Sequence, residues 1–377
     1  MPSVDKIRNV VVAGHSTSGK TALIEHLLNA GGAISRVGTI DDGNTVCDSD
    51  DQEKERKHSI DLACAHLEKD GIKVNFIDTP GYRDFLGQYY CAVAVADCVV
   101  VVVSADDGVQ PTTRKVWEIA EKLNLPRVVV INRMDREHAN FEEVLGQIQE
   151  QLSSSAVPAV AADGNGGSFS AVTSLVGSDA DGANDLMEAV VETDEALMER
   201  YLEGEEPSTD ELSAAFAGAV GSAAFFPVYP TSASSGVGID ELLGAIQNCV
   251  PSAAANTSGR EVHPLDNAEE TSPVPTGDGD PLCARVFKVV SDPYVGKLSY
   301  LRIFSGSLET NGSFINPHSG KPEKAGKIVY CQGSEQTGCD KATAGDIVAL
   351  VKVESLKAFD IITSDKPLAM APPPVPR

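Results

Sequence analysis

Short runs of β-branched residues alternate with helical patterns across residues 8–150. The apolar runs read RNVVVAG, KVNFIDTPG, CVVVVVSADDG and PRVVVINRMD, and stretches with helical spacing such as TALIEHLLNAG and KVWEIAEKLN lie between runs. Strands that are buried on both faces read as continuous Val and Ile runs, as in a parallel sheet with crossover helices. The pattern therefore predicts a doubly wound, mostly parallel α/β domain.

A segment rich in Ala, Ser, Gly and acidic residues interrupts this alternation from about residue 153 to 222. FFPVYPTSA and IDELLGAIQNCV then resume the α/β pattern. We interpret the segment as an insertion in a nucleotide-binding domain that spans residues 1–255. Within the insertion, NDLMEAVVETDEALMERYLEG has helical spacing and predicts a helix over residues 185–202.

The composition and the pattern of apolar residues change after the α/β region. A polar stretch rich in Pro, Ser and Gly predicts a linker over residues 256–280 that wraps the surface or is mobile. Short strand-like runs follow, among them LCARVFKVVSD, KLSYLRIFSG, AGKIVYC and GDIVALVKV, with turn signals about every ten residues. They predict an all-β barrel over residues 281–372, and residues 373–377 would begin another linker.

The net charge of -25 is unevenly distributed. Residues 1–140 hold 16 Lys and Arg against 21 Asp and Glu, residues 141–280 hold 2 against 25, and residues 281–377 hold 12 against 9, which gives -5, -23 and +3. Phosphate backbones would repel the middle segment, whereas the last segment could approach one.

Composition also excludes several classes of protein. No apolar run approaches the roughly 20 residues that a membrane span requires, and the first residues leave no room for a signal peptide. The eight cysteines show no spacing typical of a zinc site or a disulfide framework. We expect a cytoplasmic, monomeric protein that binds neither membrane nor DNA.

The first strand-to-helix turn fits the G-x-x-x-x-G-K-[ST] pattern of a P-loop NTPase. Its residues are Gly14, His15, Ser16, Thr17, Ser18, Gly19, Lys20 and Thr21. Successive backbone N–H groups and a helix N-terminus hold phosphates in such a loop. We expect Lys20 to neutralise the β and γ oxygens and the Thr21 hydroxyl to bind Mg²⁺.

Two later loops predict which base is bound. They contribute Asn132, Arg133, Met134 and Asp135 after the strand PRVVVI, and Ser232 and Ala233 within YPTSAS. The Asp135 carboxylate can accept from two adjacent N–H groups of guanine, whereas adenine would face it with an acceptor. Backbone at Ser232 and Ala233 would contact the guanine oxygen, so the loops favour guanine.

A third loop, after the strand KVNFI, is suited to sensing the third phosphate. It contains Asp78, Thr79, Pro80, Gly81 and Tyr82. Asp78 would reach Mg²⁺ through a water molecule, and the Gly81 N–H would donate to the γ-phosphate. The preceding TVCDSDDQEKERKHSI is charged and weakly structured, as in a loop that orders around the metal; a solvated surface loop is the alternative.

These residues together resemble the translational GTPase family, and within it elongation factor G. GHSTSGKT, EKER, DTPGYRDF and NRMDR carry the resemblance, and DPYVGKLSYLRIFSGSL and AGDIVAL are similar to that family's second domain. The resemblance covers essentially the whole chain and implies GTP or GDP with Mg²⁺ as ligands. It also implies further C-terminal domains, so we expect the chain to be a fragment holding the first two.

Three positions depart from the family pattern. The Thr that binds Mg²⁺ in the family aligns with Ser59, which keeps the hydroxyl, and Arg133 replaces a Lys beside the base. Tyr82 replaces the His that orients the attacking water. A phenol offers one hydrogen bond but cannot become an imidazolium, so we predict slow hydrolysis, with Tyr82 and Lys20 as the catalytic candidates. The alternative is that the ribosome completes the site and the phenol places water adequately.

Two charged surfaces suggest ribosomal partners. Glu188, Glu192, Glu195 and Glu199 would share one face of the predicted helix, and a different stripe that can pack inward holds Leu186, Val190, Leu197 and Tyr201. The resemblance implies that this face docks on the ribosomal stalk protein; a merely solvated face is the alternative.

The positive charges of the barrel are Lys297, Arg302, Lys321, Lys324 and Lys327, which either contact ribosomal RNA or only aid solubility. Tyr294, Tyr300 and Phe304 follow the strand pattern and are not expected to stack on bases.

The sequence therefore predicts a GTPase that binds and hydrolyses GTP on the ribosome during translocation. The alternative is a slowly hydrolysing regulatory, recycling or ribosome-protection paralogue that does not translocate. A metabolic kinase is disfavoured because Asp135, Ser232 and Ala233 specify guanine.

Overall fold

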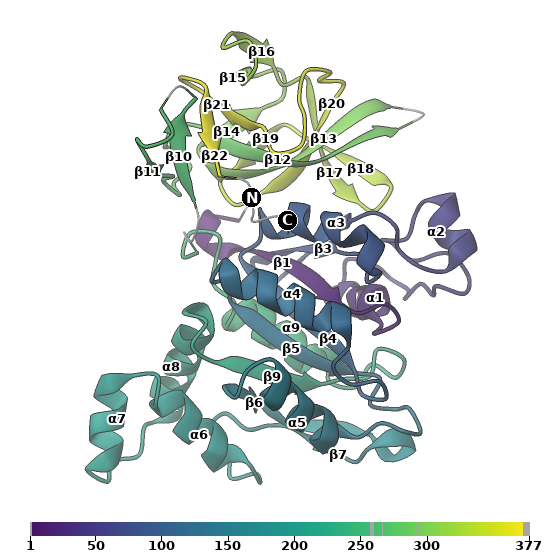
Figure 1. Cartoon of the computed structure of the whole chain (residues 1–377), viewed down its shortest axis with the longest axis vertical. Coiled ribbons are helices and arrows are strands. Elements are labelled where there is room, and N and C mark those ends of the chain that lie inside the picture. Colours follow the sequence, from purple (N-terminus) through teal and green to yellow (C-terminus); the bar gives the residue numbers. More distant parts are fainter. Residues whose placement is uncertain (1, 257–259, 266, 293–294, 372–377) are drawn as a thin grey trace.

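The computed structural model describes residues 2–256, 260–265, 267–292 and 295–371, so Tyr294 and the segment 373–377 lie outside the described residues. A mixed α/β domain carries a separate all-β domain above it (Figure 1). The order of elements confirms the predicted fold class, a mostly parallel α/β sheet followed by antiparallel sheets.

The first domain is built on a seven-stranded sheet in the order β2-β3-β1-β4-β5-β9-β6, parallel except for β2. Its strands are β1 (Ile7–Gly14), β2 (Ala63–Lys69), β3 (Ile72–Asp78), β4 (Cys98–Ser104), β5 (Arg127–Asn132), β6 (Ala156–Pro158) and β9 (Phe226–Pro230). The order jumps from β3 to β1 to β4, and phosphate-binding turns in such sheets lie at the carboxyl ends of the strands near this jump.

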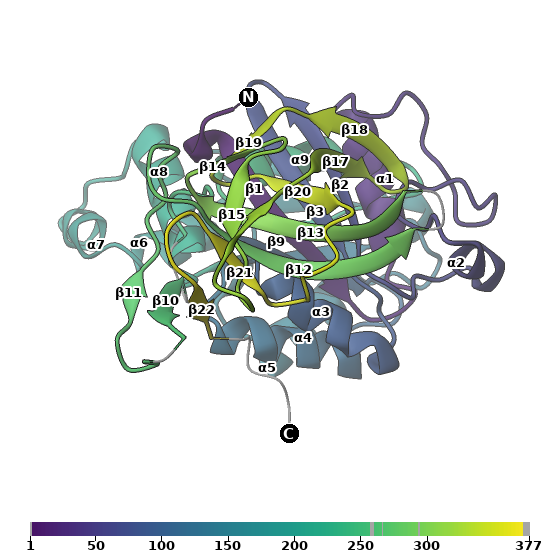
Figure 2. The same ribbon diagram turned by 90° about the horizontal axis from the view of Figure 1, so that it is seen from above.

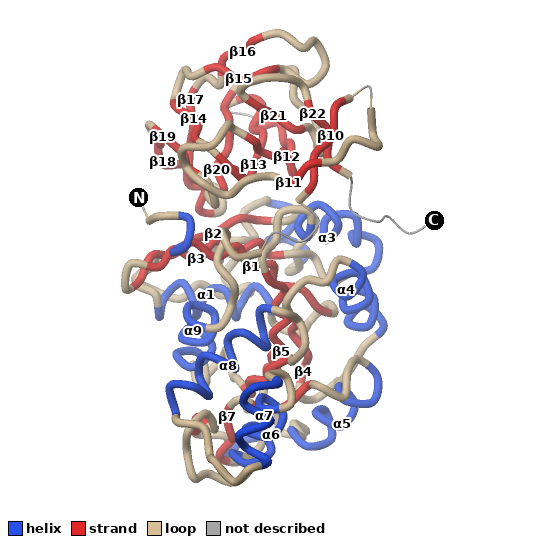
Figure 3. The backbone as a smooth tube through the Cα atoms, turned by 90° about the vertical axis from the view of Figure 1, so that its left-hand side faces the viewer, coloured by secondary structure: helices blue, strands red, loops and turns tan. Residues whose placement is uncertain are grey.

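Helices cover both faces of this sheet (Figure 3). They are α1 (Lys20–Ala30), α3 (Leu86–Val93), α4 (Pro111–Lys122), α5 (Phe141–Gln151) and α9 (Ile239–Asn248), with short helices η1 (Val4–Lys6) and η2 (Arg83–Phe85). Alternate residues of β1 enter different cores: Val11 packs with α3 and α4, whereas Val10 and Val12 pack with α1 and α9. Burial on both faces explains the continuous apolar runs.

The insertion contains the hairpin β7 (Val160–Asp163) and β8 (Ala171–Ser174), the short helix η3 (Gly166–Ser168), and the helices α6 (Ala183–Val191), α7 (Glu195–Leu202) and α8 (Thr209–Gly221). The single helix predicted over residues 185–202 is wrong. Asp194 accepts from the N–H groups of Ala196 and Leu197 and starts a new helix. Glu188 and Glu192 therefore belong to α6 and its end, Glu195 and Glu199 to α7, and the four do not share one helix face.

The second domain contains an eight-stranded antiparallel sheet in the order β16-β15-β21-β12-β13-β20-β17-β18. Its strands are β12 (Cys283–Asp292), β13 (Gly296–Ser305), β15 (Ser313–Ile315), β16 (Pro322–Lys324), β17 (Lys327–Gln332), β18 (Glu335–Cys339), β20 (Ile347–Val351) and β21 (Ile361–Thr363), beside the pair β14 (Ser307–Glu309) and β19 (Lys341–Thr343). Tyr300 and Phe304 are buried, as expected of residues that do not stack on bases.

The predicted linker contains regular structure. Within it, β10 (Glu261–Pro264) pairs with β11 (Ser272–Pro273) and with β22 (Leu368–Met370), and this small sheet lies at one side of the barrel (Figure 2). No helix of the described ranges has the length and apolar character that crossing a membrane requires.

The two domains meet through buried charges. Arg302 of the barrel and Arg260 of the linker both pair with Asp97 of the first domain, and Lys73 pairs with Asp346. Arg302 is fully buried, so its prediction as a surface contact for RNA is wrong. Lys321, Lys324 and Lys327 are exposed and Lys297 partly so, which leaves these four as surface cations of the barrel.

Candidate nucleotide-binding site

The phosphate loop joins β1 to α1 in a conformation that requires glycine at both ends. Gly14 and Gly19 have φ of 149° and 89°, and a Cβ at Gly14 would lie 2.2 Å from the carbonyl oxygen of Val102. The Lys20 ammonium donates to the carbonyl oxygen of His15 at 2.9 Å. The loop therefore already has a cradle shape, with the lysine folded across it.

Asn132 connects this loop to the two loops that are expected to contact the base. Its amide Nδ2 donates to the carbonyl oxygen of Ser18 at 2.9 Å, and its Oδ1 accepts from the N–H of Ala233 at 3.0 Å. One fully buried side chain thus fixes three loops from the ends of β1, β5 and β9, which the chain separates by about 100 residues each.

The Asp135 carboxylate faces the loop after β9. It accepts from the hydroxyls of Ser232 at 2.7 Å and Ser234 at 2.5 Å. Burial acts to raise the pKa of Asp135, but the hydrogen bonds from these hydroxyls outweigh it and hold that pKa below its ordinary value. Met134 is buried in the core, so only its backbone can face a base. Arg133 has φ of 66° and lies beside Gly19.

Four oxygen-bearing side chains gather where Mg²⁺ is expected. The Thr21 hydroxyl donates to Asp78 Oδ2 at 2.6 Å and lies 3.3 Å from the Ser59 hydroxyl, which donates to Asp48 Oδ1 at 2.7 Å. Asp78 Oδ1 and Asp48 Oδ2 are buried without a hydrogen-bond partner. Hard oxygen ligands with unused lone pairs suit Mg²⁺, so the residues present fit this ion.

Burial dominates the electrostatics of this cluster. It raises the pKa of Asp78 to about 7, aided by the neighbouring Asp48 carboxylate, and it lowers the pKa of Lys20 to about 8. A dication beside Asp78 would favour its charged form and oppose this effect of burial. The site is therefore built for charges that the bare protein accommodates poorly.

The turn after β3 lies directly on the phosphate loop. Thr79 donates to the carbonyl oxygen of Val12 and is buried, as is Pro80. A Cβ at Gly81 would lie 2.4 Å from the Ser16 nitrogen and 2.5 Å from Lys20 Nζ. The turn thus contacts the end of the loop where the third phosphate is expected, and Tyr82, which follows it, is 42% exposed.

The segment before β2 has more structure than the sequence predicts. It forms α2 (Asp51–Arg56), which Asp50 and Glu53 close with a capping box. Glu53 is buried and its Oε1 also accepts from the N–H groups of Ile60 and Asp61. The D-x-x-E spacing could have revealed this helix start.

Neither Asp48 nor Glu53 is among the residues predicted for the site. Asp48 carries no such local signal, because only the fold brings it beside Ser59.

Comparison with known proteins agrees with this site. Residues 5–252 match the model of the elongation factor Tu GTP binding domain, and residues 281–365 match that of elongation factor G domain 2. Elongation factor G-like proteins of two Mycobacterium tuberculosis strains are each 35% identical over 409 residues, covering 97% of this chain and 56% of the relative. A crystal structure of a Thermus thermophilus protein aligns with a TM-score of 0.83 at 29% identity, covering 96% of this chain and 54% of that one.

The chain thus spans about half the length of the curated relatives it matches. Its first domain nevertheless matches the GTP-binding model over residues 5–252, and its second domain matches the model of elongation factor G domain 2. The chain belongs to the translational GTPases of the elongation factor G type.

Proposed function

We propose that this protein binds GTP or GDP with Mg²⁺ and hydrolyses GTP on the ribosome during the translocation step of protein synthesis. One observation carries the proposal: Asn132 hydrogen-bonds both the phosphate loop and the loop beside the guanine-directed Asp135. A barrel of the elongation factor G type adjoins this domain. A translation factor of this kind works in the cytoplasm.

The proposed nucleotide contacts come from four loops. They are Gly14, His15, Ser16, Thr17, Ser18, Gly19, Lys20 and Thr21 at the phosphates, Asp78, Thr79, Pro80, Gly81 and Tyr82 at the third phosphate, and Asn132, Arg133, Met134, Asp135, Ser232 and Ala233 at the base. The backbone N–H groups and the α1 N-terminus favour the phosphate charge.

Thr21, Ser59 and Asp78 would hold Mg²⁺, with Asp48 close by. The ion supplies positive charge beside the phosphates, and the residues' role is to orient it through oxygen ligands. Lys20 remains mostly protonated at neutral pH with a pKa of about 8, so it can neutralise charge that develops on the transferred phosphoryl group.

Hydrolysis needs a water molecule in line with the bond that breaks. Tyr82 directly precedes η2, and its phenol has one hydroxyl with which to orient water. We infer that the isolated chain hydrolyses GTP slowly and that the ribosome stimulates it.

The ribosomal contacts are proposed on two surfaces. The exposed lysines of the barrel, Lys297, Lys321, Lys324 and Lys327, would contact RNA phosphates, with affinity that falls steeply with salt. Neutralising one of these lysines should lower the slope of log affinity against log salt by about one.

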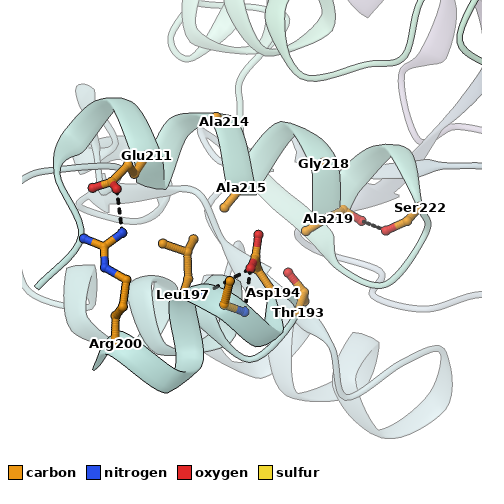
Figure 4. Close-up of a pocket in the computed structure, with 11 residues that line it drawn as sticks. Thr193, Asp194, Leu197, Arg200, Glu211, Ala214, Ala215, Gly218, Ala219 and Ser222 are labelled. Atoms are coloured by element: carbon orange, nitrogen blue, oxygen red, sulfur yellow. Dashed lines mark hydrogen bonds and ion pairs between the residues drawn. The ribbon is translucent and has the colours of Figure 1, made fainter. Parts of the chain in front are cut away.

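The acidic helices of the insertion would dock on the stalk protein. A groove of about 480 Å³ lies between α7 and α8, with small residues such as Ala215 and Gly218 on its wall and the Arg200–Glu211 ion pair at one end (Figure 4). Glu195 and Glu199 are exposed on α7, outside the residues that line the groove, and they suit a basic partner.

Tyr82 also favours a second function. A GTP-bound form that turns over very slowly would occupy the ribosome as a regulatory, recycling or protection factor without translocating. Ribosome-stimulated hydrolysis separates the two functions.

Single-turnover GTP hydrolysis with and without ribosomes tests the proposal. We expect clear stimulation by ribosomes and a further increase in Y82H. GTP binding without any stimulation would favour the second function, and no GTP binding at all would refute both. An unchanged rate in Y82H would show that the phenol has no special effect.

A further inference from the structure

An imidazole lies against the phenol of Tyr82. The ring centroids of His58 and Tyr82 are 4.6 Å apart with an interplanar angle of 54°, and the His58 ring lies 6.4 Å from that of Phe85. His58 comes from the segment before β2, whereas Tyr82 follows β3. The contact therefore joins the two segments that flank the expected third phosphate.

Both rings sit one residue from a group at that phosphate. His58 precedes Ser59, whose hydroxyl is 3.3 Å from that of Thr21. Tyr82 follows Gly81, which contacts the phosphate loop at Ser16. His58 Nδ1 lies 3.3 Å from the carbonyl oxygen of Ser59, so Nε2 is the ring nitrogen left to reach a water molecule at this point.

The fold holds His58 in place through its backbone. The His58 N–H donates to the carbonyl oxygen of Glu53 at 3.3 Å, after Lys57 turns the chain at φ of 56°. The Glu53 side chain accepts from Ile60 and Asp61 on the other side. Buried Glu53 thus holds the backbone at His58 and at the two residues after Ser59.

We propose that His58 orients the water that attacks GTP and that the Tyr82 ring supports the imidazole face. This inference rests on the proposed GTP hydrolysis. The water oxygen forms a bond to the γ-phosphorus, the bond to the β–γ bridging oxygen breaks, and GDP leaves with that electron pair. The water's protons pass to the phosphate product and solvent, and His58 contributes only a hydrogen bond from a ring nitrogen.

The decisive variant is H58F, which keeps a ring against Tyr82 but has no ring nitrogen. At saturating GTP we expect its single-turnover rate with ribosomes to fall about tenfold or more, because positioning groups contribute on this scale. Its Kd for a fluorescent GTP analogue should stay within about twofold. H58Q, which restores a hydrogen-bonding group, should recover part of the rate.

A matched control is H318F, since His318 is a half-exposed histidine of the barrel. Its rate should equal that of the unaltered chain. Y82A should lower the rate more than Y82F does, because only Y82A removes the support of the imidazole. The double variant H58F/Y82A should be no slower than the slower single variant, as expected of residues that act together.

The outcomes separate this inference from the proposed function. An unchanged rate in H58F, or a rate that falls only in proportion to GTP affinity, overturns the role of His58. Absence of hydrolysis in the unaltered chain with ribosomes also overturns it, while GTP binding would survive. Failure of the unaltered chain to bind GTP refutes the proposed function instead.

Discussion

Arg302 Nη2 lies 2.8 Å from Asp97 Oδ1, and both side chains are fully buried between the nucleotide-binding domain and the barrel. Arg302 also donates to the carbonyl oxygen of Val95, and Arg260 pairs with the same Asp97 oxygen. Burial lowers the pKa of Arg302 to about 10, so the guanidinium stays charged at neutral pH. The barrel is therefore joined to the first domain by an ion pair that is shielded from water.

Removing Arg302 should destabilise the protein. We expect R302M to lower the free energy of unfolding by about 3 kcal/mol, because Asp97 loses one of two buried cationic partners. Urea denaturation of the nucleotide-free chain measures this. K324M, at an exposed lysine of the barrel, should change stability by less than about 0.5 kcal/mol. Equal effects of the two variants would contradict the structural role of Arg302.

Asp78 should make stability depend on pH. Since burial raises its pKa from 3.8 to about 7, the folded chain binds this proton more tightly than the unfolded chain does. This contribution to the free energy of unfolding is fully present below pH 3.8 and is lost as pH rises to about 7. D78N lacks the titration, so without nucleotide or Mg²⁺ it should unfold at a higher temperature than the unaltered chain at pH 8.

The difference in unfolding temperature between D78N and the unaltered chain should be smaller at pH 5 than at pH 8. Thermal unfolding at these two pH values checks it. Mg²⁺ should raise the unfolding temperature of the unaltered chain more than that of D78N. A difference that does not vary with pH would contradict the assigned titration.

Asp135 should determine the base. In D135N the amide presents a donor where guanine also has a donor, so we expect GTP affinity to fall about 100-fold or more. Xanthine carries an oxygen in place of the guanine amino group, so affinity for its triphosphate should rise. Titration of D135N and of the unaltered chain with both nucleotides measures these two changes in affinity.

S234A serves as the matched control for D135N, because it removes one hydrogen bond to Asp135 and leaves the carboxylate. It should weaken GTP binding far less than D135N does. Retention of GTP affinity in D135N would show that the base lies elsewhere.

The break between α6 and α7 places the two acidic pairs on different helices, so each pair can be tested separately for the proposed stalk docking. We expect E195K/E199K on α7, the helix that forms one wall of the groove, to weaken binding of the stalk protein about tenfold. E188K/E192K at α6 changes the net charge equally and should have a smaller effect. Surface plasmon resonance at two salt concentrations measures both. Equal losses would indicate attraction by net charge alone.

The sequence by itself determined the nucleotide fold and its loops. Continuous Val runs, glycines at fixed spacing and the residues at strand ends are local signals, because each loop follows directly from its own strand. Gly14 and Gly19 are required by backbone geometry that the motif already encodes. The prediction that Asp135 contacts guanine rests on the same kind of local signal.

Only the tertiary structure decided which residues of distant segments contact one another. Arg302 reads as one surface cation among several, and nothing local reveals that Asp97 buries it. In the sequence Asp48 is one of several charged residues, and only the fold brings it beside Ser59. His58 contacts Tyr82 only because β2, which follows His58, pairs with β3, which precedes Tyr82. Such contacts depend on distances between parts of the chain that pattern and propensity do not specify, because these act over a few neighbouring residues.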